Sequence, residues 1–239
     1  IRFGLIMTVI SKIKVDRIIV SSTTSLTAVF KNCNGKVLFC NREDDLCGSD
    51  YTNPNKIKIN NNNEESYNNE NNYNLDQEEN IVKLSWENDM TDCRCIFSGC
   101  VNLISLDFSD FDTSKITTFE RMFVSCENLI SLDLTNFNTT LVNNLREMFY
   151  HCYLLTSLDL SSFDTTQVTN IFGIFEGCYS LSYLDISTFD TSKIKSMRRM
   201  FWECKSLPYL DISHFNTSLV TTMYGMFQNC YFLTSLNLF

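Results

Sequence analysis

Two kinds of hydrophobic spacing alternate along the second half of the chain. Around Leu132 and Leu134, apolar and polar residues alternate, which predicts a short strand over 131–135 whose leucines point inward. In the preceding stretch, apolar residues recur at steps of three and four, which predicts a helix of about ten residues with one buried face. The members of this second set are Ile116, Phe119, Met122, Phe123 and Cys126. Short strands and short helices should therefore alternate.

The pattern returns at a constant interval along the chain. Six cysteines mark it, each three residues after a phenylalanine: Cys100, Cys126, Cys152, Cys178, Cys204 and Cys230. A fixed period of about 26 residues is typical of a repeat architecture, in which each copy buries its apolar edges against its neighbours. One copy could not stand alone, because ordering its backbone costs about 1–2 kcal/mol per residue. We expect residues 81–239 to form a solenoid, with a capping half-repeat at 81–96, five full repeats and a truncated sixth.

Two segments precede the repeats. Residues 1–55 contain LTAVFKNCNGKVLFC, where Asn34-Gly35 between apolar stretches is a strong hairpin signal and predicts a small β-rich segment. Residues 56–80 include NNNNEESYNNENNYN, have little to bury and should form a disordered linker. The apolar opening IRFGLIMTVI would fit the remains of a signal peptide, but KIKVDR follows instead of a small-residue cleavage site. No run reaches the roughly 18 apolar residues of a membrane span.

The motif F-[DN]-T-[ST] joins each expected strand to the next expected helix. Asp, Asn, Ser and Thr side chains can accept a hydrogen bond from the first turn of a helix, so we interpret the motif as a helix cap. Its copies are 111–114, 137–140, 163–166, 189–192 and 215–218.

Composition and charge remove several classes of function. A net charge of -9 without a basic cluster argues against nucleic acid as a partner. No phosphate-binding loop, dinucleotide fingerprint or plausible triad is present, and the two histidines, His151 and His214, fall in separate repeats. We therefore expect no enzyme activity and no cofactor.

The recurring M-F-x-x-C-x-x-L-x-x-L-D-[LIF]-[ST]-x-F-[DN]-T-[ST]-x-[VI] resembles the BspA-like leucine-rich repeat of bacterial surface proteins, mycoplasma lipoproteins and some microbial eukaryotes. The resemblance covers residues 97–239 and, more loosely, 81–96. It implies an α/β repeat fold, a right-handed leucine-rich-repeat-like solenoid of short parallel strands and short helices, here preceded by the small β-rich segment. It also implies display at the cell surface and attachment to host proteins or other cells. It transfers no catalytic residue.

The eleven cysteines divide into two groups. Cys93 and the six periodic cysteines lie on the apolar stripe and should be small interior residues. The other four could form two disulfides, with three possible pairings, in an oxidising compartment. They are Cys33, Cys40, Cys47 and Cys95, of which Cys95 aligns with Arg121, Glu147 and Arg199 and should face water. Zinc is the alternative, although the gaps exceed the usual ligand spacing.

An aspartate occupies the outward position of successive expected strands: Asp107, Asp133, Asp159, Asp185 and Asp211, ending at Asn237. Charges on strands ~4.8 Å apart repel by about 3 kcal/mol at an effective dielectric of 20. Neighbouring serine and threonine hydroxyls and water could relieve this in a solvated structural ladder. Calcium bridging adjacent carboxylates is the alternative.

The partner-binding candidates lie on the same face. Tyr183 and Tyr209 stand where other copies carry serine, and exposed aromatic residues are common anchors for partners. With Asp133, Asp159, Asp185 and Asp211 they form one candidate surface. The exposed positions of the expected helices form another: Glu120, Arg146, Phe172, Arg198 and Tyr224.

The resulting hypothesis is a non-catalytic, cell-surface or secreted repeat protein that binds a protein or glycan partner in adhesion or host contact. An intracellular, cytoplasmic interaction scaffold of a microbial eukaryote is the first alternative, favoured by the asparagine-rich linker. A calcium-dependent structural protein is the second. Two disulfides among the four non-periodic cysteines would favour the surface, and four free thiols the interior of the cell.

Overall fold

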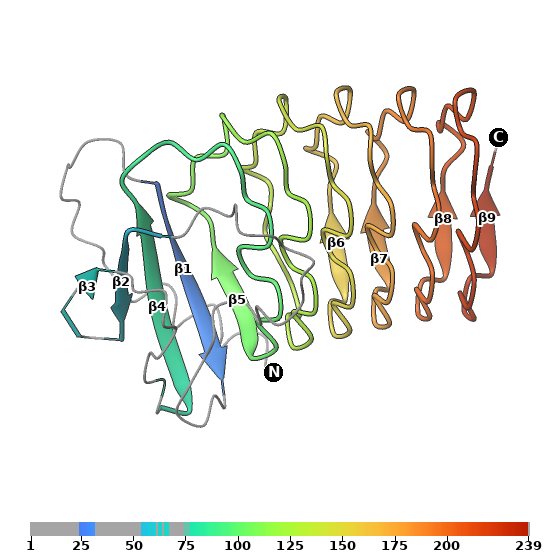
Figure 1. The fold of residues 1–239 in the computed structure, drawn as a ribbon. Helices are drawn as coiled ribbons and strands as arrows, with labels where there is room; N and C mark the ends of the chain where they lie inside the picture. The colour runs from blue at the N-terminus through green and yellow to red at the C-terminus, as the bar shows by residue number, and fades with distance from the viewer. Residues whose placement is uncertain are drawn as a thin grey trace.

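The computed structural model describes residues 24–31, 54–60, 62–63, 65–66, 75 and 77–238, and within them the chain forms nine strands and no helix. Five strands near the N-terminal end make one antiparallel sheet in the order β3-β2-β4-β1-β5. They are β1 (Thr24–Lys31), β2 (Lys56–Ile59), β3 (Glu65–Ser66), β4 (Glu79–Trp86) and β5 (Leu103–Asp107). From β5 onward the repeats stand side by side in a row, drawn from green to red in Figure 1.

The sheet uses residues that the sequence had assigned to a linker. Ile57 and Ile59 of β2 are buried and pair with Leu84 and Val82 of β4, while the alternate Lys58 is exposed. The linker prediction is therefore wrong for β2 and β3, because alternating apolar residues gave β2 a buried face despite the asparagine-rich surroundings. The hairpin expected at Asn34-Gly35 lies outside the described residues.

The predicted capping half-repeat at 81–96 divides between two structures. Its first part belongs to β4 of the sheet. Its second part is stacked on the following repeat, because the N–H groups of Cys93 and Cys95 donate to the carbonyls of Thr118 and Glu120. The sheet reaches the same repeats through β5, whose Asp107 pairs with Thr27 of β1. The antiparallel sheet thus covers the end of the stack, and its strand β1 pairs with the backbone groups of β5 that would otherwise form an open edge.

Backbone hydrogen bonds join each repeat to the next. In the segment around Phe119, every second N–H group donates to a carbonyl of the following repeat, at 2.8–3.0 Å. These pairs are Phe119 to Asn144, Arg121 to Arg146, Phe123 to Met148 and Ser125 to Tyr150. The intervening N–H groups of Met122, Val124 and Cys126 close turns within their own repeat. The segment is therefore a series of tight turns held by its neighbour.

The short helices predicted for these segments are absent from the described residues. Two positions in each repeat, four residues apart, have positive φ, as at Arg121 (56°) and Ser125 (56°). A right-handed helix requires negative φ throughout, so the steps of three and four arise from turns that bring every apolar side chain to one side. The other left-handed residues of the repeats are Cys95, Gly99, Glu147, His151, Gly173, Gly177, Arg199, Glu203, Gly225 and Asn229.

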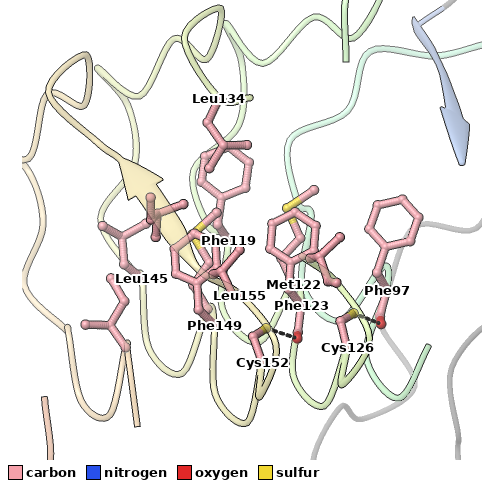
Figure 2. Packing of buried hydrophobic residues seen from close by; sticks show 14 of the residues in the cluster. Phe97, Phe119, Met122, Phe123, Cys126, Leu134, Leu145, Phe149, Cys152 and Leu155 are labelled. Carbon is pink, nitrogen blue, oxygen red and sulfur yellow. Dashed lines mark hydrogen bonds between the residues drawn. The ribbon is translucent and has the colours of Figure 1, made fainter. Parts of the chain in front are cut away.

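Aromatic rings and thiols form the centre of the stack. Six phenylalanines lie in one column from Phe97 to Phe227, with neighbouring ring centroids 5.5–6.0 Å apart and planes within 14°. Beside them, the thiol of Cys152 donates to the carbonyl of Phe123 at 3.1 Å, and Cys126 does the same to Phe97 (Figure 2). The periodic cysteine is thus a small core residue that also satisfies a buried carbonyl.

The F-[DN]-T-[ST] motif does not cap a helix. Its first polar side chain accepts the N–H group two residues later, as Asp164 does from Thr166 at 2.9 Å. In the first four copies its threonine is buried and binds the next repeat, as the Thr165 hydroxyl accepts from the N–H of Asp190 at 2.7 Å and donates to its carbonyl at 3.2 Å. The capping interpretation is wrong because there is no helix to cap, but the same side chains satisfy backbone groups in a turn.

Short parallel strands are present on one face of the stack. β6 (Ser157–Asp159) pairs with β7 (Tyr183–Asp185), and β8 (Tyr209–Asp211) pairs with β9 (Ser235–Asn237). Both pairs are parallel, and each residue lies opposite its equivalent in the next repeat. The assignment to a right-handed leucine-rich-repeat-like solenoid stays a prediction.

Candidate binding site

The predicted aspartate column lies at the ends of the strands. Each aspartate accepts the N–H group two residues later at 2.9–3.1 Å, as Asp211 does from Ser213 at 2.9 Å. This N–H group, the Ser213 hydroxyl and the side chain of Asn237 lower the pKa of Asp211 to about 2. Hydrogen bonds from Thr135 and Ser187 likewise lower the pKa values of Asp133 and Asp185. All five aspartates therefore shape a turn, and Asp133, Asp185 and Asp211 are held in the ionised form.

No ion pair neutralises this column among the described residues. The same part of the chain holds no group of three or more His, Cys, Asp or Glu side chains placed to bind a metal ion. Calcium bridging by Asp107, Asp133, Asp159, Asp185 and Asp211 thus gains no geometric support, and the column presents uncompensated negative charge along one edge of the strand face.

Tyr183 and Tyr209 lie on this face at the start of β7 and β8. Their side chains are 54% and 52% exposed. Each hydroxyl donates to the aspartate two residues later, at 3.5 Å to Asp185 and 3.2 Å to Asp211. The charge of Asp185 raises the pKa of Tyr183, so the hydroxyl stays protonated at neutral pH. The structure thus brings both predicted tyrosines together with two of the predicted aspartates.

Pro208 interrupts the backbone ladder between these two strands. At the equivalent positions, the N–H groups of Thr156, Ser182 and Thr234 each donate to the preceding repeat at 2.9–3.0 Å. Proline has no N–H group, and the carbonyl of Ser182 receives no hydrogen bond from the described residues of the next repeat. β7 and β8 accordingly fall into two separate two-stranded sheets (Figure 1).

The interruption extends along the strand. At neighbouring junctions the N–H of Leu160 donates to Asp185 and that of Ile212 donates to Asn237, both at 2.9 Å. Within the described residues, the corresponding N–H of Ile186 has no bond to Asp211, and that of Leu134 has none to Asp159. The turn segments of the same two repeats remain joined, since Phe175 still donates to Met200 at 3.1 Å. At this junction the strand side thus lacks its ladder bonds, while the turn side keeps those of Gly173, Phe175 and Gly177.

A pocket of ≈ 510 Å³ occupies this opening. Its walls include both tyrosines and both aspartates, with Pro208 and His214 from the later repeat. The Nε2 atom of His214 lies 3.1 Å from the carbonyl oxygen of Ile186, which ties the two repeats together below the gap. The sequence pattern indicated the tyrosines but not Pro208 or His214, although a proline in a column of Ile, Thr and Ser was a visible signal.

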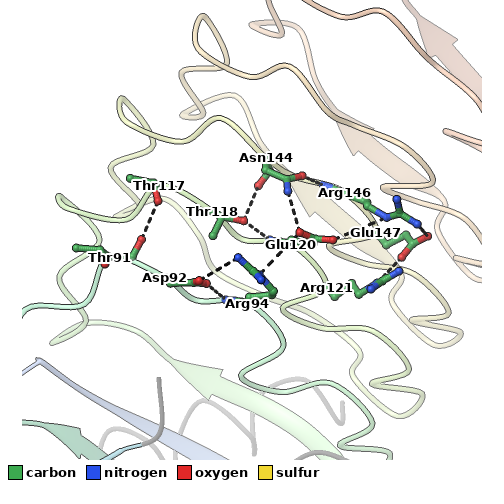
Figure 3. A network of polar contacts seen from close by, with 10 residues as sticks. All are labelled: Thr91, Asp92, Arg94, Thr117, Thr118, Glu120, Arg121, Asn144, Arg146 and Glu147. Atoms are coloured by element: carbon green, nitrogen blue, oxygen red, sulfur yellow. Dashed lines mark hydrogen bonds and ion pairs between the residues drawn. The ribbon is translucent and has the colours of Figure 1, made fainter. Parts of the chain in front are cut away.

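The second candidate surface is largely occupied by contacts among its own members. Glu120 accepts a hydrogen bond from Asn144 at 2.9 Å and lies 3.8 Å from Arg94 (Figure 3). The guanidinium of Arg146 lies over the ring of Phe172, 4.9 Å from its centroid. Beneath this column, the buried Arg121 and Glu147 form an ion pair at 2.5 Å. These residues stabilise the stack by binding one another, which leaves the strand face as the stronger candidate.

The cysteines divide as the sequence predicted, with one exception. Cys93 and the six periodic cysteines are free, and all but the half-buried Cys230 are buried. Cys95 was expected to face water, but it is buried and disulfide-bonded. Its backbone has the same left-handed conformation as Arg121, Glu147 and Arg199, and Arg121 and Glu147 are themselves buried, so this column position does not face water as expected. Cys33, Cys40 and Cys47 lie outside the described residues, so the pairing stays a prediction.

These observations define a protein of stacked repeats with an interrupted strand face. The chain belongs to the family described as "Mycoplasma protein of unknown function, DUF285", whose model matches residues 63–182 and 155–238. No curated protein and no solved structure matches it. In the part of the chain that the structure describes, no helix is long and apolar enough to cross a membrane.

Proposed function

We propose that this chain is a non-catalytic repeat protein, secreted or displayed at the cell surface, that binds a protein or glycan partner in adhesion or host contact. We also propose that its repeats are of the BspA-like leucine-rich type, which is a more specific assignment than the matching family model gives. The observation that carries it is the pair of half-exposed tyrosines, Tyr183 and Tyr209, beside an open pocket between β7 and β8.

The stack suits binding because it holds this pocket rigidly. The two repeats that form it are joined on their turn side by backbone bonds and by the rings of Phe175 and Phe201, 5.6 Å apart. A partner therefore meets tyrosines that are already positioned, so little conformational entropy is lost on binding. Tyrosine offers a large amphipathic contact area, which makes it common at the energetic centre of interfaces.

The disulfide at Cys95 supports the location outside the cytoplasm. Structural disulfides persist in oxidising environments and are rare where glutathione and thioredoxin keep thiols reduced. The cytoplasmic scaffold of a microbial eukaryote would instead keep this cysteine as a thiol.

Protease treatment of intact source cells tests the location. We expect the full-length protein to disappear while a cytoplasmic control protein survives. Survival of the protein alongside the control would contradict surface display and would favour the intracellular scaffold.

Adhesion of protein-coated beads to neighbouring or host cells tests binding. The variant Tyr183→Ser/Tyr209→Ser restores the residue found at positions 105, 131, 157 and 235, so it should keep the fold. We expect this variant to lose most adhesion, whereas Ile130→Thr, at an exposed apolar site on another repeat, should retain it. Equal adhesion of the tyrosine variant and the native chain would contradict the proposed site. Prior treatment of the cells with protease or with glycosidases separates a protein partner from a glycan.

A further inference from the structure

We propose that the pocket between β7 and β8 binds a cationic side chain, arginine or lysine, projecting from a protein partner. This inference rests on the proposed binding function and specifies its ligand chemistry. The juxtaposition that carries it is two tyrosine rings and two carboxylates, from Tyr183, Tyr209, Asp185 and Asp211, around one opening.

Charge is the first reason. Asp185 and Asp211 line the pocket, and Asp159 lies next to Asp185 in the β6–β7 register. None of the three forms an ion pair within the described residues, and the pocket walls contain no lysine or arginine. A cation entering here would gain attraction to the whole row, and its charge would relieve the mutual repulsion of the carboxylates.

The aromatic rings are the second reason. Both are about half exposed, and a tyrosine face attracts a cation placed within about 6 Å of its centroid. The same fold already makes this contact elsewhere, where Arg199 lies 4.5 Å from the ring centroid of Trp202 and Lys205 lies 3.6 Å from that of Tyr179. At the pocket the rings have no cation of their own in the described residues, so the cation must come from a partner.

The origin of the opening is the third reason. Pro208 removes the N–H group that would pair with Ser182, and the resulting volume of ≈ 510 Å³ admits a long side chain between the strands. A guanidinium that enters this space can donate to the carboxylates and to the Ser182 carbonyl, while its flat surface meets the rings. A neutral sugar could stack on the rings but would leave the carboxylate row uncompensated.

Tyrosine signals in NMR spectra of the protein provide the test. The probe is Nα-acetyl-arginine methylamide, and its uncharged counterpart is Nα-acetyl-citrulline methylamide. The signals of Tyr183 and Tyr209 are identified by their loss in the single serine variants. We expect the arginine probe to shift both signals and the citrulline probe to bind about tenfold more weakly. Equal shifts from both probes, or shifts from methyl β-galactoside in their place, would overturn the cationic assignment.

Two variants test separately the charge of the pocket and its shape. Asp185→Asn/Asp211→Asn removes two charges but should keep the turn, because Asn138 and Asn216 also accept the N–H group two residues later. It should weaken arginine binding by about tenfold or more, while Asp133→Asn, in the same column away from the tyrosines, should change it little. Pro208→Ser restores the N–H group of its column, and we expect it to close the pocket and abolish the shifts. Unchanged arginine binding in either pocket variant would overturn the inference.

The adhesion function and the cationic ligand can each be disproved without the other. If coated beads adhere through the tyrosines but the arginine probe does not bind, the binding function stands and the cationic ligand is wrong. If the arginine probe binds but beads do not adhere to any cell, the pocket chemistry stands and the adhesion function is wrong.

Discussion

The hydroxyl of Thr139 makes two hydrogen bonds to the backbone of Asp164 in the next repeat: it accepts the N–H group at 2.7 Å and donates to the carbonyl oxygen at 3.0 Å. Thr139 is almost fully buried. One side chain therefore satisfies both polar groups of a residue in another repeat. The same arrangement recurs at Thr165, which makes the threonine of the motif a structural link between repeats.

Removing this hydroxyl should destabilise the stack. Thr139→Val keeps the shape but leaves the N–H and carbonyl of Asp164 without partners, so we expect a loss of about 2–3 kcal/mol in the free energy of unfolding. Thr139→Ser keeps the hydroxyl and should cost about 1 kcal/mol through the lost methyl group. Urea unfolding followed by circular dichroism measures both. Equal losses in the two variants would show that the hydrogen bonds contribute nothing.

Gly177 occupies a position that should tolerate no other residue well. Its φ is +76°, and a Cβ atom there would lie 2.3 Å from Cδ2 of His151. We expect Gly177→Ala to cost about 3 kcal/mol, from left-handed strain together with the clash. Gly173→Ala has similar strain at φ +54°, but its nearest contact, Oε2 of Glu176, lies farther away at 3.1 Å, so about 1 kcal/mol is expected.

A double-mutant cycle isolates the clash at Gly177. In a His151→Ala background, Gly177→Ala should cost about 1 kcal/mol, which is the strain alone. Thermal or urea unfolding of the four proteins gives the coupling energy. Additive effects would contradict the contact between the two positions.

Thiol reactivity should follow burial along the cysteine column. Burial raises the pKa of Cys178 to about 12 and that of the half-buried Cys230 to about 11. Since the thiolate is the reactive form, iodoacetamide at pH 8 should label Cys230 before Cys178. Cys178 should react only when urea unfolds the stack. Peptide mass spectrometry over time measures both rates, and early labelling of Cys178 would contradict its burial.

Acid should weaken the stack through its turn aspartates. The pKa of Asp211 falls from 3.8 to about 2 in the folded protein, so the unfolded chain takes up a proton first as the pH drops. The stabilisation is complete above pH 3.8 and is lost between there and about pH 2. Asp133 and Asp185 shift in the same direction.

The variant Asp211→Asn tests how the free energy of unfolding depends on pH. Asp211→Asn keeps a side-chain acceptor but cannot titrate, so its free energy of unfolding should fall less steeply between about pH 4 and pH 2 than that of the native chain. Urea midpoints measured across this range provide the comparison. Identical slopes would show that Asp211 makes no difference to acid stability.

The sequence predicted the strand face better than the turn face. On the strand face, the outward aspartates marked the correct positions, because a strand reverses its side chains at every residue. The strand predicted over 131–135 is wrong, since this segment forms only an isolated bridge at Ser131. On the turn face, steps of three and four predicted a helix, which is absent from the described residues. All four glycines of the repeats, Gly99, Gly173, Gly177 and Gly225, fall at the two left-handed positions and could have revealed the turns.

The sequence predicted the pocket only in part. Tyr183 and Tyr209 stood out because their column otherwise contains serine, so the sequence alone placed them among the candidates. The opening between them depends on a missing N–H group at Pro208, and its effect appears only when the neighbouring strand is in place.

By itself, the sequence determined the repeat length, the inward residues of each copy and the polar residues that shape its turns, because these depend on spacing along the chain. The tertiary structure decided where the backbone groups find their partners. In these segments every second N–H bonds to a carbonyl in the next repeat, so the segment forms turns and not a helix. Local propensity differs by only a few tenths of a kcal/mol per residue, and the adjacent repeat decides the outcome by satisfying the backbone groups that the turns leave open.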